Sequence, residues 1–289
     1  MFNKAARKIN LGEQNLLPFS MLSGKVDPLF CKGLYLVLFL RIFFSWSAMI
    51  TYLEIFPTES SGLTTNFLLN PFDLYIKYPA YFLSGILVIS GVSIFLPLNL
   101  LSSTILLVTS YSLVPMAPKL YSGADLVLTV FLGYAWVLVL VRGYPRNFLN
   151  KITYPDLIFF FLKMHLGFIY LQSGVDKLFS PYWRSGEALY IATRLPSYVP
   201  AHLQMDLPGI VFQGLSWLVI LFEILFIVLI WHSKTRNFIL FTGVIFELII
   251  FWYFSIPDFA LVMLCGYIPF LKKGPPIQDF FKRSQAQIL

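Results

Sequence analysis

The segment Ile210-Val-Phe-Gln-Gly-Leu-Ser-Trp-Leu-Val-Ile-Leu-Phe-Glu-Ile-Leu-Phe-Ile-Val-Leu-Ile-Trp231 contains a single ionisable side chain, that of Glu223. A helix needs about 20 consecutive apolar residues to cross the hydrocarbon core of a bilayer. This segment therefore predicts a membrane-spanning helix. The whole chain has the same character, because 58% of its 289 residues are hydrophobic and 12% are charged. We predict a polytopic membrane protein.

Apolar windows of similar length recur along the chain, separated by turns rich in proline and glycine. They cover residues 33–53, 80–96, 98–116, 124–141, 156–176, 210–231 and 237–255, with a shorter one at 258–271. We therefore predict an all-α bundle of about eight transmembrane helices with both termini on one side. The chain is predicted to be a single membrane domain over 1–289, with a leader at 1–32, the bundle at 33–271 and a tail at 272–289. We detect no internal repeat and no separate soluble domain.

The basic residues indicate which side the termini occupy, since cytoplasmic loops of membrane proteins are enriched in Lys and Arg. With the N-terminus inside, fourteen of the 21 basic residues lie in cytoplasmic segments: Lys4, Arg7, Lys8, Lys25, Lys32, Arg142, Arg146, Lys151, Lys234, Arg236, Lys272, Lys273, Lys282 and Arg283. Only five lie outside: Lys77, Lys119, Lys177, Arg184 and Arg194. Both termini are therefore predicted to be cytoplasmic, in a multi-pass integral membrane protein. Topology explains the net charge of +7 better than nucleic-acid binding does.

Two loops on the outer side are long enough to be structured. The first, residues 54–79, contains the apolar run Asn66–Ile76, which is expected to lie on the bilayer or over the mouth of the bundle. In the second, residues Trp183–Leu195 place apolar side chains on one helical face and Arg184 and Glu187 on another. This pattern predicts a short interfacial helix.

Several ionisable residues fall within the apolar windows, where charges are costly and usually face a partner or a cavity. Counting 1.5 Å per residue along each helix places Arg41, Lys163 and Glu223 at similar depth. Glu223 paired with one or both of these cations is the simplest expectation. His165 has no potential ligands at metal-binding spacing, so no metal site is predicted.

Glu247 has no cation at its expected depth. It is expected to be protonated, to accept a hydrogen bond from a neighbour, or to line a cavity open to the outer face. A carboxyl group in such a place suits a general acid or base. A neutral, hydrogen-bonded core carboxyl is an equally good interpretation.

On the fifth predicted helix, Tyr170, Gly174 and Lys177 share one face, and Gly174 allows a ligand or a helix to approach closely. A desolvated lysine there can serve as a base. Alternatively, Lys177 extends to the lipid headgroups and has no chemical role. Asp125, in Ser122-Gly-Ala-Asp125, either pairs with Lys177 or caps its helix.

The run Gly174-Val-Asp-Lys-Leu178, followed by Trp183, Gly186 and Ala188, resembles the signature of the HTTM domain, the membrane part of the vitamin K-dependent gamma-carboxylase superfamily. The segment from Glu247 to Leu264 resembles a late helix pair of the same family. The likeness extends over about residues 33–271.

The closer likeness is to a short bacterial branch that includes sporulation-delaying protein B, which is needed to mature a secreted peptide toxin. Features similar to that branch are Ser122-Gly-Ala-Asp-Leu126, Leu221-Phe-Glu-Ile-Leu225 and the lack of a large lumenal domain. The resemblance implies that Lys177 is the base that deprotonates a quinol. It also implies a quinone or other isoprenoid lipid as cofactor, with Tyr170, Gly174 and Trp183 around it.

The chain also differs from the carboxylases. They have a histidine where Glu247 stands and an asparagine where Ile250 stands, so the resemblance implies a related site and not the full carboxylation reaction. Peptide recognition would then fall to an accessory protein.

Three functional hypotheses follow. In the first, an outward-facing site of Lys177, Asp125, Glu187 and Glu247 helps to mature a secreted peptide precursor, together with an accessory protein. In the second, the protein is a redox enzyme that binds a quinone or isoprenoid lipid, with Lys177 as base. In the third, it is a non-catalytic scaffold, exporter subunit or immunity protein, whose charges only hold helices together.

Overall fold

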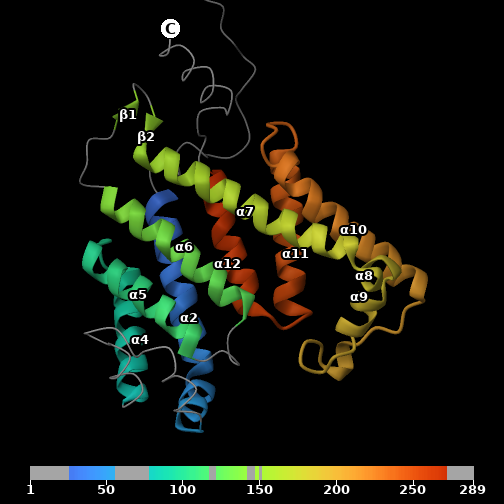
Figure 1. The fold of residues 1–289 in the computed structure, drawn as a ribbon, viewed down its shortest axis with the longest axis horizontal. Coiled ribbons are helices and arrows are strands. Elements are labelled where there is room, and N and C mark those ends of the chain that lie inside the picture. The colour runs from blue at the N-terminus through green and yellow to red at the C-terminus, as the bar shows by residue number, and fades with distance from the viewer. Residues whose placement is uncertain (1–25, 56–77, 117–121, 142–146, 150–151, 272–289) are drawn as a thin grey trace, which may run out of the picture.

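The computed structural model describes residues 26–55, 78–116, 122–141, 147–149 and 152–271. Its helices are α2 (Val26–Ile55), α4 (Pro79–Phe95), α5 (Leu100–Met116), α6 (Gly123–Leu140), α7 (Tyr154–Phe179), α8 (Pro181–Ser185), α9 (Glu187–Ala192), α10 (Gly209–Leu229), α11 (Arg236–Trp252) and α12 (Pro257–Tyr267). Short 3-10 turns occupy Ala201–Leu203 (η3) and Ile268–Leu271 (η4). Each of the eight predicted windows matches one of the long helices within a few residues, apart from α2, which begins earlier (Figure 1).

The structure differs from the all-α prediction at one place. Between α6 and α7, strands β1 (Asn147–Leu149) and β2 (Ile152–Thr153) form a small antiparallel pair. The two strands lie beyond the start of α7, outside the helical bundle (Figure 1). The mostly helical architecture is therefore as predicted.

Four helices are long and apolar enough to cross a membrane. They are Pro28–Thr51 within α2, Gly123–Leu140 (α6), Tyr154–Phe179 (α7) and Gly209–Leu229 (α10). Shorter apolar helices cover Ala80–Phe95, Leu100–Leu113 and Pro257–Leu271. Helices of this length and apolar composition are typical of a membrane protein.

The helices pack in neighbouring pairs, α2 with α4, α5 with α6, α7 with α10, and α11 with α12. At the centre, the Phe30 ring of α2 contacts Phe131 of α6 and Phe159 of α7, with centroids 6.3 and 6.1 Å apart. In lipid, helices associate through close packing and polar contacts, not through release of water. Hydroxyl pairs across the bundle, such as Ser110 with Thr129 at 2.7 Å, supply such contacts.

Two helices, α7 and α10, run obliquely across the bundle and lie against each other, whereas α2, α11 and α12 are steeper in the same view (Figure 1). Glycines make this close approach possible. A Cβ on Gly174 would come within 2.8 Å of Ile224 Cγ1 and 2.9 Å of Glu223 Cβ, and one on Gly167 within 2.9 Å of Ile227 Cγ1. The sequence-based expectation of a close approach at Gly174 is met by a neighbouring helix.

The predicted interfacial helix over Trp183–Leu195 is two helices, not one. Gly186 ends α8 with φ of 83°, a left-handed conformation that favours glycine. A Cβ at Gly186 would also collide with the α10 backbone at Gln213. The chain turns there because it has to pack on α10, and α9 ends at Ala192. The other predicted outer feature, Asn66–Ile76, lies outside the described residues.

Candidate functional site

The ammonium group of Lys177, in the last turn of α7, forms an ion pair with Glu223 in the middle of α10. Lys177 Nζ donates to both carboxylate oxygens at 2.8 Å and to the hydroxyl of Ser173. The Lys177 side chain is 17% exposed and that of Glu223 is 5% exposed. Lys177 therefore does not extend to the headgroups, and the snorkelling alternative does not describe its side chain.

Helix geometry explains this pairing. Ser173 and Lys177 are one turn apart on α7, so their polar groups point the same way. Gly174 lies between them and allows the α10 backbone at Glu223 to come close. Without this close crossing, the carboxylate would be farther from the ammonium group.

The predicted pairing of Glu223 with Arg41 or Lys163 is wrong. That prediction assumed that all helices run perpendicular to the membrane plane and begin at the same depth. Because α10 is oblique and its first half extends past the end of α7, where it packs on α8 and α9, Glu223 is level with Lys177. Lys163 instead lies over the ring of Phe270, with Nζ 5.2 Å from the centroid.

The Lys177–Glu223 pair lines a pocket of about 660 Å³. Side chains of α7, α10, α11 and α12 form its walls, and Trp183, Leu189 and the segment after α9 cover its outer end. Lys177 Nζ lies 5.1 Å from the centroid of the Trp183 ring, a cation–π contact. Most of the other lining side chains are apolar, as in pockets that bind small lipophilic molecules.

Tyr170 also lines the pocket and connects it to Glu247. Its hydroxyl donates to Glu247 Oε1 and lies 2.5 Å from the hydroxyl of Tyr267. Glu247 is fully buried and does not line the pocket itself. Of the alternatives left open by the sequence, the structure shows Glu247 hydrogen-bonded to a neighbour and placed behind the pocket wall.

Asp125 belongs to a different cluster. Its carboxylate accepts two bonds from the Arg41 guanidinium, at 2.9 and 3.1 Å, and it also forms a capping box with Ser122 at the start of α6. A second carboxylate, that of Asp258, lies 3.3 Å from Arg41. The capping alternative for Asp125 is therefore correct, and its carboxylate pairs with Arg41 and not with Lys177.

Glu187 is exposed at the start of α9 and does not line the pocket. Of the seven residues that the sequence singled out, the structure brings Lys177, Tyr170 and Trp183 to one cavity, with Gly174 and Glu247 in the layer behind it. Glu223 is the member that sequence reasoning assigned to another partner. The sequence indicated that Glu223 is important, because it is an ionisable residue in an otherwise apolar window. No sequence feature identified Lys177 as its partner.

The pocket lining combines one ion pair with mainly apolar side chains. Within the described part of the chain, no group of three or more His, Cys, Asp or Glu side chains gathers as metal ligands do. The ammonium donates hydrogen bonds and has no lone pair, whereas the carboxylate beside it accepts them. The three ammonium protons already bond to Glu223 and Ser173, so a ligand hydroxyl or carbonyl can bond to Lys177 in place of one of these contacts, and a hydroxyl can donate to Glu223.

No protein-family model matches the chain, and neither a characterised protein nor a solved structure is similar enough to count as a match.

Proposed function

We propose that the protein binds a lipid-soluble amphiphile of the quinone or isoprenoid class, with its polar head against Lys177 and Glu223, and that the pair moves a proton to or from that head. The observation that carries this proposal is the placing of a buried ion pair in the wall of a large, mainly apolar pocket. Ionisable groups that are buried within a membrane and face a cavity commonly have a functional role. A lipophilic molecule with one hydrogen-bonding end satisfies both parts of the lining.

The geometry of the Lys177–Glu223 ion pair suggests a role for each residue. With its proton in place, Lys177 donates to a ligand oxygen and stabilises negative charge there. To act as a base, its nitrogen must first lose that proton, and the Glu223 carboxylate, bonded to it at 2.8 Å, can accept it. Tyr170 borders the same pocket and is held by Glu247 and Tyr267. Lys177 and Glu223 are thus the proposed catalytic residues, and Glu247 acts through Tyr170.

Peptide maturation remains a prediction that the pocket itself does not favour. A peptide brings N–H and C=O groups that need partners when they are buried, and this lining offers few. If a secreted peptide is modified, the pocket holds the cofactor, and the peptide meets the exposed surface around α8 and α9. Mass spectrometry of secreted peptides from cells with the native protein or Lys177→Ala tests that role separately.

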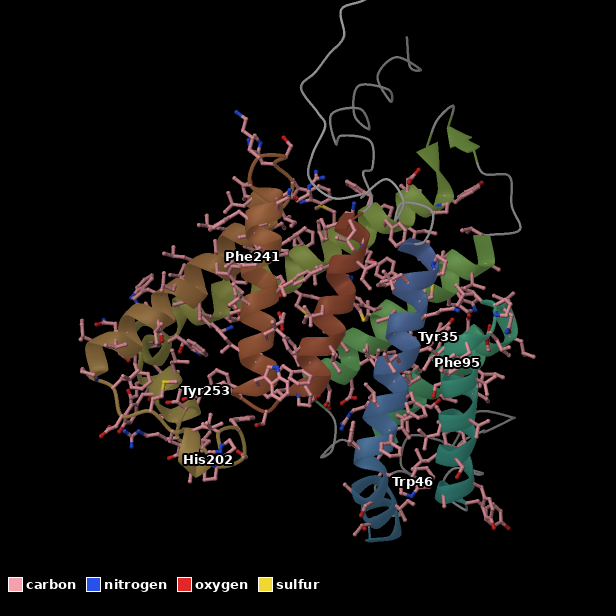
Figure 2. The ribbon with its side chains drawn as sticks, turned by 180° about the vertical axis from the view of Figure 1, so that it is seen from behind. Tyr35, Trp46, Phe95, His202, Phe241 and Tyr253 are labelled. Atoms are coloured by element: carbon pink, nitrogen blue, oxygen red, sulfur yellow. The ribbon has the colours of Figure 1, made fainter. Side chains whose placement is uncertain are left out.

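We further propose that the chain crosses the membrane eight times with both termini cytoplasmic. In support, the start of α2, the β1–β2 hairpin, the turn between α10 and α11 and the end of α12 lie at one end of the molecule (Figure 1). Lys234 is in that turn, and Arg236 begins α11. Trp46 and His202 lie at the other end (Figure 2). Accessibility of single cysteines introduced at Lys234 and His202 to an impermeant thiol reagent tests this topology.

The test of binding uses a naphthoquinone without a tail as the probe, with the purified protein in lipid nanodiscs. We expect saturable binding that is lost in the double variant Lys177→Met/Glu223→Gln and retained in Arg184→Met, an exposed cation outside the pocket. Equal binding by wild type and the double variant would contradict the proposal. It would favour a purely structural role for the pair.

A further inference from the structure

We propose that the ligand enters the pocket sideways from the bilayer, between α10 and α11, and that its apolar tail stays in this opening while its head contacts Lys177. The inference rests on the proposed function and adds a substrate feature to it. A water-soluble molecule does not fit this arrangement, and an amphiphile with a long tail does.

The pocket is open along the α10–α11 side. Six residues that line it are also substantially exposed on the outside of the molecule. Four of them lie on this side: Leu215 at 41% and Leu218 at 64% on α10, and Ile245 at 44% and Ile249 at 48% on α11. The other two, Met205 at 48% and Leu207 at 36%, belong to the segment after α9. A side chain that both lines a cavity and reaches the exterior marks an edge of its mouth.

The arrangement of the helices agrees with this position. The two helices meet at the turn between them and diverge from there toward α8 and α9 (Figure 1). Phe222 and Phe246 pack across the gap, with ring centroids 5.1 Å apart. Both helices belong to the apolar bundle, so the medium outside this opening is hydrocarbon and not water.

The outer end of the pocket is covered by α8 and α9, and of the side chains that line it there, Met205 and Leu207 of the following segment are exposed. Gly186 lies directly on the α10 backbone, and the side chain of Gln213 donates to Arg184 O at 3.3 Å. The ring of Tyr190 packs edge-on against Phe212, with centroids 5.3 Å apart. These contacts hold α8 and α9 against α10, as a cover over the pocket.

The polar groups of the lining fix the orientation of the ligand. The hydroxyl of Thr242, on the α11 side, is bonded to Phe238 O in its own helix, and that of Thr193 to Tyr190 O. Neither hydroxyl therefore needs a hydrogen bond from a ligand. Tyr253, which also lines the pocket, has a buried hydroxyl with no hydrogen-bond partner among the described residues, so it can bond to a ligand. The ion pair on the α7 side and this hydroxyl therefore attract the polar head, and the apolar edge between α10 and α11 receives the tail.

The experiment compares two probes, a naphthoquinone with a long isoprenoid tail and the same head without a tail, on variants that narrow the proposed opening. Leu218→Trp and Ile245→Trp place a large ring at its edges. Leu221→Trp and Leu248→Trp are matched controls, since these residues lie on the same helices, are similarly exposed and do not line the pocket. All four variants are compared in nanodiscs with the full-length protein.

We expect the two opening variants to weaken binding of the tailed probe by about tenfold, the loss expected when roughly two methylene groups are excluded from the opening. Binding of the tail-less probe and both controls should be unchanged. If the opening variants bind the tailed probe as the controls do, side entry is wrong and the proposed function stands. A fifth variant, Met205→Trp, narrows the exposed part of the outer end, and a loss of binding in this variant alone would place the entrance there and also overturn side entry. If wild type binds neither probe, the proposed function itself fails.

Discussion

Among the described residues, two clusters of buried charge tie helices together, and one of them lines the pocket between α7, α10, α11 and α12. Arg41 joins α2 to Asp125 of α6 and Asp258 at the start of α12, and none of the three lines the cavity. Lys177 joins α7 to Glu223 of α10, and both border it. The two clusters are buried and paired to a similar degree, so burial and pairing do not distinguish a purely structural charge from one that can act on a ligand. The difference between them is the free space beside the Lys177–Glu223 pair.

The largest expected effect is on the structural cluster. Arg41→Met leaves Asp125 and Asp258 without the cation that they contact, which should lower the free energy of unfolding by about 3–5 kcal/mol. Thermal unfolding in detergent measures the loss, and the exposed Arg184→Met serves as control. A wild-type melting temperature in Arg41→Met would remove the basis for calling this cluster structural.

The second prediction concerns the pair at the pocket. Lys177→Met alone leaves a buried carboxylate and should destabilise the protein, whereas Lys177→Met/Glu223→Gln removes both charges and should recover most of that stability. Probe binding should fall about 10- to 100-fold in both, because hydrogen bonds to charged groups contribute about 1.5–3 kcal/mol. Unfolding and binding are measured on the same samples. A stable double variant with full binding would make the two clusters equivalent.

The sequence predicted the eight helices because each is a long apolar run bounded by turn-forming residues. It also placed Tyr170, Gly174 and Lys177 on one face, since spacing along one helix follows from its period. Contacts between helices could not be predicted in the same way. The partner of Glu223 depends on how far α10 extends past α7, and no residue pattern within either helix records that offset.

The break at Gly186 and the position of Glu247 show the same limit. The apolar face over residues 183–195 is consistent with one helix, but packing on α10 forces a left-handed turn at Gly186. Glu247 accepts a hydrogen bond from Tyr170, which is one of the alternatives that the sequence left open. That it would be separated from the pocket by Tyr170 depends on the packing of three helices.

A third, smaller effect should follow from loosening the α7–α10 crossing. Gly174→Ala puts a methyl group against Ile224 and Glu223, and overpacking of this kind costs about 1–3 kcal/mol. Because the crossing also positions the ion pair, probe affinity should fall with stability. Gly214→Ala on α10 is the matched control, since a Cβ there meets no atom within 4 Å. Equal behaviour of the two variants would show that close packing at Gly174 does not matter.

The smallest effect is expected at the edge of the structural cluster. Asp258 is 32% exposed and lies 3.3 Å from Arg41, so Asp258→Asn should change the free energy of unfolding by no more than about 1 kcal/mol. The corresponding change at the buried Asp125 should cost several times as much, since it removes a two-bond contact and a helix cap. Melting temperatures of the two variants decide this, and a larger loss at Asp258 would reverse the assignment.

The most direct test of the central claim is to identify the small molecules that co-purify with the protein by mass spectrometry. Wild type, Lys177→Met/Glu223→Gln and Arg184→Met would be extracted from the same membranes. We predict a lipid-soluble molecule with one polar head that is enriched with wild type and Arg184→Met and depleted from the double variant. Identical lipid profiles in all three would contradict the account, because the Lys177–Glu223 pair would then hold helices together and bind nothing.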